Sequence, residues 1–452
     1  MEKINVLVIG GGASGLQAAI SAKTTHPEKS VFLVRKEEKM LVPCGIPYIF
    51  GSLQDSDKDI LPDKLLTNVG VEIRIAEVTA LDLENKECLL SNGNKLYFEK
   101  LILATGSIPT KPKWLKGSDL ENVFTIPKNK LYLDKMHDQL KGVKKVVTIG
   151  AGFIGVEVSD EMNKAGWDVT LVEIEPYILS KAFDKEFGVK AQELLKTRGV
   201  KVITNKGVQE IKGKDGKVNH IVLTNGEKIE TDAVILSMGY APNTGLAKKS
   251  GIELNELGFI KTCEYMRVNN CSSDIYAVGD CAEKRDFLTR KLNATMLAST
   301  ACAEARIAGM NLYGLSPCKT FSGTIAIYDT AIGDVAFGTA GVTEDKAISE
   351  NFDILTGSFT GMDKHPGTLP GAHEQTVKLI VAADCGMIIG GEVCGGTSVG
   401  ELTNLIGFLI QNRTNIRTLL AAQIGTHPLL TGSPAGYPLI KAAEVLAKKF
   451  KK

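Results

Sequence analysis

The sequence has 452 residues, too many for one ordinary hydrophobic core, so two to four domains are expected. Its 53 Lys and Arg balance 52 Asp and Glu, which argues against nucleic acid or an anionic membrane surface as a partner. No apolar run reaches the roughly 20 residues of a membrane span. The chain enters a strand pattern directly, without a signal peptide, and its nine cysteines show no metal-type pairing. We expect a cytoplasmic protein without a metal site.

The first predicted element is an apolar strand over residues 4–9, which runs into a glycine-rich turn and a helix over 16–23. In this context Gly10 makes the tight turn, Gly12 lets the backbone approach a pyrophosphate, and Gly15 allows close packing of helix on strand. The pattern therefore predicts a dinucleotide site.

The second strand of this unit, over residues 30–34, should end in an acid for an adenosine ribose. Arg35 stands there instead, with Glu37 and Glu38 just beyond. Which of these residues contacts the ribose is left open by the sequence.

A single cysteine, Cys44, follows between Pro43 and Gly45. Pro47 suits the first turn of a helix, because its missing N–H would be unpaired there in any case. A thiol near a helix N-terminus feels the positive end of the helix dipole, which favours the reactive thiolate. The alternative interpretation is that Cys44 is a small buried hydrophobic residue.

The stretch after this thiol predicts β segments over residues 71–83 and 87–90. A continuous apolar run over 101–104, directly after Lys100, then predicts a buried parallel strand, which ends sharply at Thr105 and Gly106.

A second unit repeats the order of strand, glycine turn, helix and strand, over residues 146–149, 150–155, 156–165 and 168–172. Its last strand ends in Glu173, and an acid at this spacing hydrogen-bonds a ribose 2′-hydroxyl but would repel a 2′-phosphate. This favours NADH over NADPH. Two dinucleotide folds in one chain suggest two dinucleotides that hand electrons to each other.

Two further patterns complete the second unit and return to the first. A buried strand over 233–236 leads to a loop with Gly239, and Asp280 directly follows a strand and Gly279. An acceptor at the carboxyl end of a strand can bind a ligand hydroxyl. A helix over 294–311 should follow.

From residue 320 onward the pattern changes to an α+β region without a cofactor motif, whose default role is an oligomer interface. Antiparallel strands are expected over 323–328, 331–337, 376–381 and 387–393, and helices over 399–411 and 437–449, with a hairpin turn at 384–386.

These motifs, in this order, resemble the FAD-dependent pyridine nucleotide-disulfide oxidoreductase family over essentially the whole chain. The resemblance implies an α/β fold of two Rossmann-like dinucleotide-binding domains, one for FAD and one for NAD, plus a C-terminal α+β dimerisation domain, and hence a homodimer. The implied bounds are 1–112 and 244–319 for FAD, 113–243 for NAD and 320–452 for dimerisation.

The resemblance also implies the cofactor-binding residues, with Phe153 as an aromatic gate over the flavin. FAD and NADH are the expected cofactors. The residues are Gly10, Gly12, Ala13, Ser14, Gly15, Arg35, Lys36, Pro43, Ala104, Thr105, Gly106, Gly150, Gly152, Phe153, Ile154, Gly155, Glu157, Glu173, Gly239, Gly279 and Asp280.

The thiol motif resembles a single-cysteine branch of the family, because the position five beyond Cys44 is Ile49 rather than a second cysteine. That branch includes CoA-disulfide reductases, NADH oxidases, NADH peroxidases and persulfide or polysulfide reductases. Ala13 stands where the peroxidases and water-forming oxidases have a histidine, and Met40 to Pro43 depart from the Ser-Phe-x-Asn that precedes the thiol in CoA-disulfide reductases.

The C-terminal His427-Pro428-x-Leu430 is similar to the His-Pro-x-Leu of lipoamide dehydrogenases, whose histidine is an acid/base that reaches across the dimer. The glutamate that orients this histidine in the relatives would fall at Gly432. The alternative is that His427 merely caps a turn.

The expected function is therefore an FAD-dependent NADH oxidoreductase that reduces a disulfide, persulfide or polysulfide through Cys44 and the flavin, with His427 as acid/base. The alternatives are an NADH oxidase that reduces oxygen at the flavin, and an electron-transfer flavoprotein for a protein partner. The other cysteines are interpreted as structural: Cys88, Cys263, Cys271, Cys281, Cys302, Cys318, Cys385 and Cys394.

Overall fold

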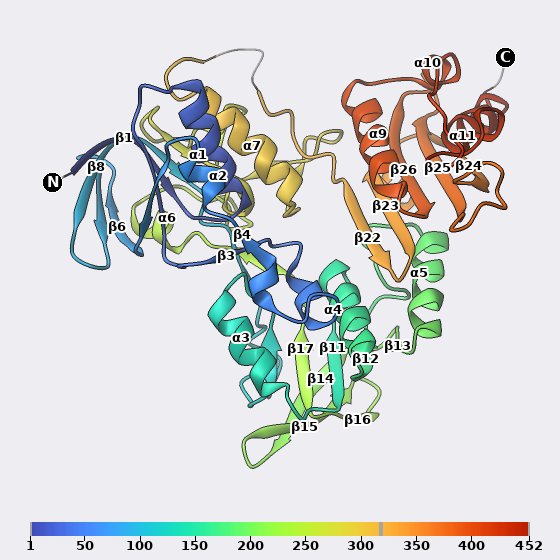
Figure 1. The fold of residues 1–452 in the computed structure, drawn as a ribbon, viewed down its shortest axis with the longest axis horizontal. Helices are drawn as coiled ribbons and strands as arrows, with labels where there is room; N and C mark the ends of the chain where they lie inside the picture. The colour runs from blue at the N-terminus through green and yellow to red at the C-terminus, as the bar shows by residue number, and fades with distance from the viewer. Residues whose placement is uncertain (1, 316–319, 451–452) are drawn as a thin grey trace. The chain divides into compact units, whose positions relative to one another are not determined.

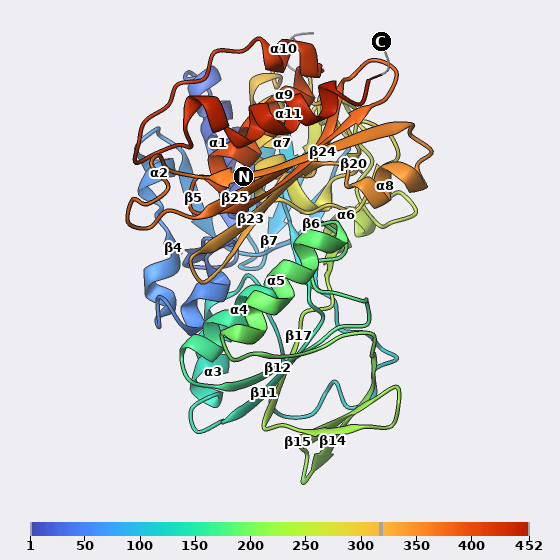
Figure 2. The same ribbon diagram turned by 90° about the vertical axis from the view of Figure 1, so that its right-hand side faces the viewer.

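The computed structural model describes residues 2–315 and 320–450, so Cys318 lies outside the described residues. The chain forms two compact units, drawn in Figures 1 and 2. The first unit comprises Met1–Pro112, Phe124–Gly142 and Met238–Thr324, and the second comprises Lys113–Val123, Val143–Ser237 and Ile325–Lys452. Within the described ranges, no helix has the length and apolar character that crossing a membrane requires.

The first unit is built on a seven-stranded mixed sheet. Its strands follow the order β5 (Glu72–Ile75), β2 (Val31–Arg35), β1 (Glu2–Ile9), β8 (Lys95–Leu103), β7 (Glu87–Leu90) and β6 (Val78–Asp82), and β19 (Ile275–Ala277) also pairs with β8. The β5, β2, β1, β8 and β19 pairings are parallel, whereas β6, β7 and β8 pair antiparallel. The parallel Rossmann-like sheet is confirmed, and the expected β segment over 71–83 is two separate strands.

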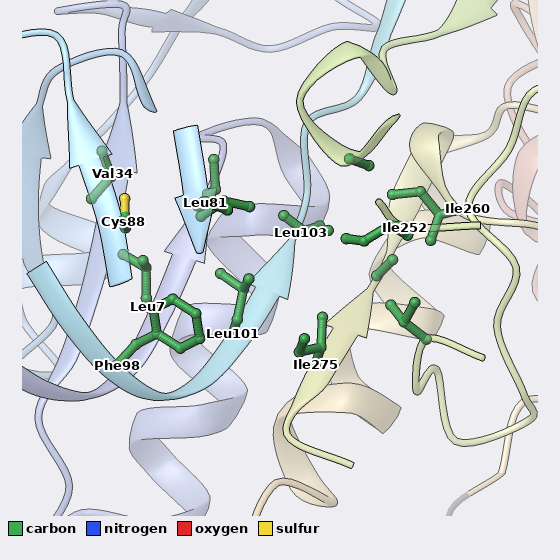
Figure 3. Packing of buried hydrophobic residues seen from close by; sticks show 14 of the residues in the cluster. Leu7, Val34, Leu81, Cys88, Phe98, Leu101, Leu103, Ile252, Ile260 and Ile275 are labelled. Atoms are coloured by element: carbon green, nitrogen blue, oxygen red, sulfur yellow. The ribbon is translucent and has the colours of Figure 1, made fainter. Parts of the chain in front are cut away.

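Alternate residues of β1 serve two hydrophobic cores, as a strand with both faces covered requires. Leu7 packs with Phe98 and Leu101 in the core drawn in Figure 3, which also contains the buried Cys88. Val6 and Val8 instead face the helices α1 (Ala13–Thr25) and α7 (Ala298–Met310).

Helices α1 and α7 lie against each other in the first unit (Figure 1). Their contact is close because α7 has a glycine there: a Cβ at Gly309 would lie 2.7 Å from the Ser21 Cβ. The shorter elements of this unit are β3 (Met40–Leu41), η1 (Ile46–Phe50), η2 (Ser56–Asp59), β4 (Ile60–Leu61), α2 (Lys64–Thr67), β9 (Ser107–Pro109), α3 (Lys130–Gln139), β18 (Tyr240–Pro242), α6 (Gly245–Lys249), η3 (Gly279–Cys281), β20 (Lys284–Arg285) and β21 (Leu292–Asn293).

The second unit begins with a parallel sheet in the order β17 (Ala233–Leu236), β11 (Lys145–Ile149), β12 (Asp168–Val172) and β13 (Lys201–Ile203). The second unit also contains the helices α4 (Phe153–Lys164) and α5 (Lys185–Thr197). A separate antiparallel sheet consists of β14 (Val208–Lys214), β15 (Lys217–Leu223) and β16 (Lys228–Glu230). The short β10 (Val123–Thr125) pairs with β17 and is the fifth strand of the first of these two sheets. The repeated strand, turn and helix of the sequence is thus confirmed.

The C-terminal part of the second unit is an antiparallel sheet in the order β22 (Tyr328–Ile332), β23 (Val335–Gly341), β26 (Ile388–Gly395), β25 (Glu374–Ala382) and β24 (Ile354–Met362). Helices α9 (Val399–Gln411) and α11 (Pro438–Ala447) cover one face of this sheet (Figure 2). The remaining elements are α8 (Glu344–Ser349), α10 (Ile416–Leu420) and η4 (Pro434–Gly436).

Two strand predictions in this region were wrong. The run over 331–337 is broken by a two-residue turn at Gly333 and Asp334, where Ile332 pairs with Val335. The expected strand over 323–328 begins only at its last residue. Strand β24 was not expected, because glycines weaken strand patterns. Its Gly357 is required by packing, since a Cβ there would lie 2.6 Å from the Leu446 Cγ of α11.

Candidate active site

Cys44 is exposed, in the short segment that joins β3 to η1. Two backbone features fix this segment: Leu41 pairs with Ile60 across β3 and β4, and the Gly45 N–H donates to the Val42 carbonyl at 2.8 Å. The buried-hydrophobe interpretation of Cys44 is therefore wrong.

The helix after this thiol differs from the expected one. It is a five-residue 3-10 helix, η1, with Gly45 as its N-cap and Pro47 in its first turn. A macrodipole needs several aligned turns. The sequence argument from a helix dipole therefore does not apply at Cys44.

A buried carboxyl group lies directly behind the thiol segment. A Cβ at Gly45 would lie 1.8 Å from the Asp59 Oδ1, so any other residue here requires the Asp59 carboxyl group or the thiol segment to shift. Asp59 is 5% exposed, and its Oδ2 has no hydrogen-bond partner within the described residues. Burial raises the pKa of Asp59 to about 6. No residue near Gly45 in the sequence indicates this contact.

The thiol has no second cysteine beside it in the helix, because Ile49 occupies that position and is 2% exposed. Most other described cysteines are shielded: Cys88, Cys281 and Cys394 are buried, and burial raises the pKa of Cys88 to about 12. Burial also raises the pKa values of Cys271 and Cys302, while Cys263 is half-buried and Cys385 is exposed in a hairpin turn.

The first glycine loop has the geometry of a dinucleotide cradle. Gly10 has a φ of +116°, and a Cβ there would lie 2.1 Å from the Ala104 carbonyl oxygen. A Cβ at Gly15 would lie 1.9 Å from the Gly10 carbonyl oxygen, whereas one at Gly12 would meet no atom within 4 Å. The close approaches and the open side fit a loop that receives a pyrophosphate.

Several other predicted FAD residues gather around this loop. Gly279, at a φ of +75°, faces Ser14, because a Cβ there would lie 2.4 Å from the Ser14 Oγ. The Ala13 carbonyl lies 3.8 Å from the Cys302 Sγ. Thr105 donates its hydroxyl to the Asn243 carbonyl at 2.6 Å.

Asp280 accepts hydrogen bonds from the Ser107 Oγ at 2.7 Å and the Lys128 Nζ at 2.6 Å. Burial raises its pKa, but the charge of Lys128 and these two hydrogen bonds outweigh burial, so the pKa lies below its usual value. The result is a held carboxylate acceptor at the end of β19. Sequence reasoning missed Lys128, which is about 150 residues away along the chain.

Arg35 is buried beneath the first loop rather than extended into solvent. Its guanidinium donates to both carboxylate oxygens of Asp63, at 2.6 and 2.7 Å, and to two backbone carbonyls. A Cβ at Gly11 would lie 2.5 Å from the Arg35 Cδ. Arg35 therefore supports the loop from below, while Lys36 is exposed. Asp63 was not identified from the sequence.

The second glycine loop repeats the first. Gly150 has a φ of +97°, a Cβ at Gly155 would lie 1.9 Å from the Gly150 carbonyl oxygen, and one at Gly152 would be in open space. The Glu173 carboxylate accepts from the Ala151 N–H at 2.6 Å, so it lies against this loop as the ribose interpretation requires. Gly239, by contrast, belongs to the first unit, where its carbonyl accepts from the Thr110 N–H.

The start of α4 is held by strand β22. The Phe153 ring stacks on Tyr328, with ring centroids 5.0 Å apart and planes 9° apart, and the Glu157 Oε1 accepts from the Thr330 Oγ1 at 2.8 Å. Two strand residues rise about 6.7 Å and four helix residues 6.0 Å, so the two pairs match in pitch. Burial raises the pKa of Glu157 to about 7.

This contact belongs to a wider aromatic cluster. Phe183 lies 6.2 Å from Phe153 and 6.4 Å from Phe337, centroid to centroid, and Phe187 lies 6.5 Å from Phe183. Ile154, beside Phe153, is half-buried.

The second unit also contains a buried ion-pair network around Lys378. Its Nζ lies 2.8 Å from Asp184, 2.6 Å from Glu186 and 2.8 Å from Glu344. The carboxylates of Asp184, Glu186 and Glu392 are close enough together to hold a metal ion, but Lys378 lies among them as the counter-charge. Burial raises the pKa of Glu392 to about 9.

His427 is exposed in the second unit, in the loop between α10 and η4. Its ring Nδ1 accepts from the Leu429 N–H at 3.3 Å, so the ring does cap a turn. The backbone N–H of His427 donates to the Thr431 Oγ1. Cys44 belongs to the first unit.

Comparisons with known proteins place these features in a family. Residues 4–305 match the family model described as pyridine nucleotide-disulphide oxidoreductase, and residues 327–435 match its dimerisation domain. The chain is 29% identical to an NADH oxidase of Methanocaldococcus jannaschii, over 99% of each chain. It is 30% identical to an NAD(P)H coenzyme A polysulfide/persulfide reductase of Pyrococcus horikoshii, over 98% of each.

The fold resembles the solved structure of an NAD-dependent persulfide reductase from A. fulgidus, with a TM-score of 0.88 and 29% identity. The match covers 99% of this chain and 83% of that one.

Proposed function

The chain belongs to the pyridine nucleotide-disulphide oxidoreductase family, and from this we propose that it is an NADH-dependent flavoenzyme that reduces a sulfur–sulfur bond at Cys44. The observation that carries the proposal is the exposed thiol of Cys44. The thiol lies beside Gly45, where a Cβ would collide with Asp59, and the helix that follows contains no second cysteine. A relative at 30% identity is named for polysulfide and persulfide reduction, which supports this substrate class.

The chain has residues that fit the binding of two dinucleotides, FAD and NADH. The Gly10 to Gly15 loop and the Asp280 carboxylate would hold FAD, and the Gly150 to Gly155 loop with Glu173 would hold NADH. When bound, FAD supplies the two-electron relay between NADH and sulfur. The Glu173 carboxylate would repel a 2′-phosphate, which supports NADH as the electron donor.

Cys44 is the group that reacts with the substrate. Its thiolate attacks one sulfur of the S–S bond, forms a mixed disulfide and releases the other sulfur as a thiolate. The electron pair that NADH supplied then cleaves the mixed disulfide and restores the Cys44 thiolate. One NADH, one proton and one S–S bond thus give NAD⁺ and two thiols. The family resemblance points to the loop that carries His427 as the source of this proton.

A homodimer is supported by the match of residues 327–435 to the dimerisation domain. Four large apolar side chains among the described residues of this part of the chain are exposed: Ile348 at 59%, Phe408 at 64%, Leu429 at 55% and Leu430 at 68%. An interface that buries them also suits the expectation that the His427 loop reaches the thiol of the other protomer.

The test is anaerobic NADH turnover with a panel of CoA disulfide, polysulfide, persulfide, lipoamide and protein disulfides. Cys44→Ser should keep FAD and its reduction by NADH but lose sulfur turnover. Cys385→Ser, at the other cysteine that is exposed among the described residues, should behave as the wild type. Full sulfur turnover by Cys44→Ser would contradict the proposal.

A second candidate is an NADH oxidase, which the name of the Methanocaldococcus relative favours. Oxygen consumption that survives Cys44→Ser and exceeds every anaerobic rate would select it. Slow turnover with all small acceptors and rapid turnover with one protein disulfide would select electron transfer to a protein partner.

A further inference from the structure

The two oxygens of the Asp280 carboxylate have different surroundings. Oδ2 accepts hydrogen bonds from the Ser107 Oγ at 2.7 Å and from the Lys128 Nζ at 2.6 Å. Oδ1 accepts none from the residues that the structure describes, and the side chain is 12% exposed. All three residues belong to the first unit. One oxygen is therefore engaged within this unit, and the other is open to a ligand.

Lys128 lies in the segment between β10 and α3, and its ammonium group is held in place. The Nζ also donates to the Ser107 Oγ, at 3.0 Å. It lies 5.6 Å from the centroid of the Tyr240 ring, within the range of a cation–π contact. The Tyr240 hydroxyl donates to the Ile126 carbonyl, two residues before Lys128. Tyr240 thus contacts both the ammonium group and the backbone segment that carries it.

A second lysine near Asp280 has a carboxylate partner of its own. The Lys284 Nζ lies 3.2 Å from the Glu304 Oε2, and both side chains are fully buried. The same Nζ donates to two backbone carbonyls. Burial raises the pKa of Glu304 to about 7. Lys284 therefore serves Glu304 by direct contact, and Lys128 serves Asp280.

The remaining titratable neighbours of Asp280 carry no charge. Burial raises the pKa of the Cys281 thiol, and burial and the charge of Asp280 raise the pKa of Tyr240. Both groups therefore keep their protons at neutral pH and leave the charge of Asp280 to the lysines.

Lys128 decides the protonation of Asp280. Burial raises the pKa of this carboxyl group, and the charge of Lys128 and its hydrogen bond are the next largest influences, which lower it. Without Lys128, burial would be opposed only by weaker influences, such as the Ser107 hydrogen bond and the charge of Lys284, so the pKa would rise. A protonated carboxyl group is a poorer hydrogen-bond acceptor than a carboxylate.

We propose that Lys128 is a positioning residue of the FAD site, which keeps Asp280 ionised and leaves its Oδ1 free to accept a hydroxyl group of FAD. The inference rests on the proposed function, because it requires FAD at this site. Lys128 acts through Asp280 rather than on the cofactor. The consequence is that FAD stays bound at mildly acidic pH, where a buried carboxylate without a cation would take up a proton.

The test measures the release of FAD from the diluted holoenzyme by the fluorescence of free FAD. Lys128→Met should hold FAD as the wild type does at about pH 8 but about tenfold less tightly toward about pH 5, because a charged hydrogen bond becomes a neutral one. Lys128→Arg keeps the charge and should follow the wild type. Lys128→Gln keeps an N–H without the charge and should follow Lys128→Met.

Two controls separate the charge from other effects. Ser107→Ala removes a neutral donor to the same oxygen, so it should weaken FAD binding by about threefold at every pH. Glu304 titrates in the wild type and in these variants alike, so the ratio of their affinities cancels its contribution. Lys128→Met combined with Asp280→Asn should show no further loss toward low pH, because the titrating carboxyl group is gone.

Three results would overturn the inference. They are a ratio of Lys128→Met to wild-type affinity that is constant with pH, a Lys128→Arg variant that loses FAD as Lys128→Met does, or a pH effect that persists in the double variant. A wild type that retains FAD but reduces no sulfur acceptor refutes the proposed function alone, because the readout here is binding. A wild type that binds no FAD refutes both.

Discussion

Gly45→Ala tests whether the buried carboxyl group behind Cys44 fixes the position of the thiol. The added Cβ would lie 1.8 Å from the Asp59 Oδ1, and real Cβ atoms stay at least 3.0 Å from such an atom, so the two must separate by more than 1 Å. The Asp59 carboxyl group is 5% exposed and has little room to turn away, so we expect the thiol segment to take up part of this separation. A 1 Å displacement of a nucleophile costs about 100-fold in rate, or about 2.7 kcal/mol.

The assay compares sulfur turnover with the reduction of bound flavin by NADH in Gly45→Ala, Asp59→Ala and the double variant. Only the first rate should fall in Gly45→Ala, and the double variant should recover most of it, because the colliding oxygen is gone. A full rate in Gly45→Ala, or an unchanged loss in the double variant, would refute the reasoning.

Three further predictions concern single side chains. Because the pKa of Asp59 is raised to about 6, the native state loses stability as pH rises from about 4 to 6, by at most about 3 kcal/mol. The melting temperature of Asp59→Asn should therefore rise relative to that of the wild type across this pH range. A difference between the two melting temperatures that does not change with pH would contradict this. Glu173→Ala should lower the preference for NADH over NADPH at least tenfold in kcat/KM, because a charged hydrogen bond of about 1.5–3 kcal/mol and a repulsion are lost; an unchanged ratio would count against the ribose contact. Lys378→Met should destabilise the protein by about 3–5 kcal/mol, since it leaves Asp184 and Glu186 without their counter-charge; a melting curve like that of the wild type would show that the network is dispensable.

The parts of the fold that local chemistry dictates were predictable. Gly10 and Gly150 adopt positive φ, and Gly15 and Gly155 approach a backbone carbonyl. Both requirements favour glycine, so the glycine pattern in the sequence predicts both loops. The length and apolar character of the parallel strands predicted the two parallel sheets. Asp280 could be placed for the same reason, because it follows a strand and a glycine.

The parts that depend on distant contacts were not predictable. Nothing local to Gly45 indicates Asp59, and nothing local to Asp280 indicates Lys128. The helix after Cys44 was expected from Pro47, but proline fits the first turn of a 3-10 helix as well as that of an α-helix. Strand β24 contains Gly357, which is required by the helix α11 that packs on it. The sequence pattern of the strand alone does not show that contact.

The aromatic cluster at the start of α4 has a consequence for synthesis of the chain. Phe153 and Phe183 leave the ribosome early, but their partners Tyr328 and Phe337 follow only about 150–175 residues later. At 5–20 residues per second, the two rings wait about 8–35 s for those partners. The ring faces that Tyr328 and Phe337 cover stay uncovered during this interval, so we expect a chain that stops before residue 328 to aggregate more readily than the full chain.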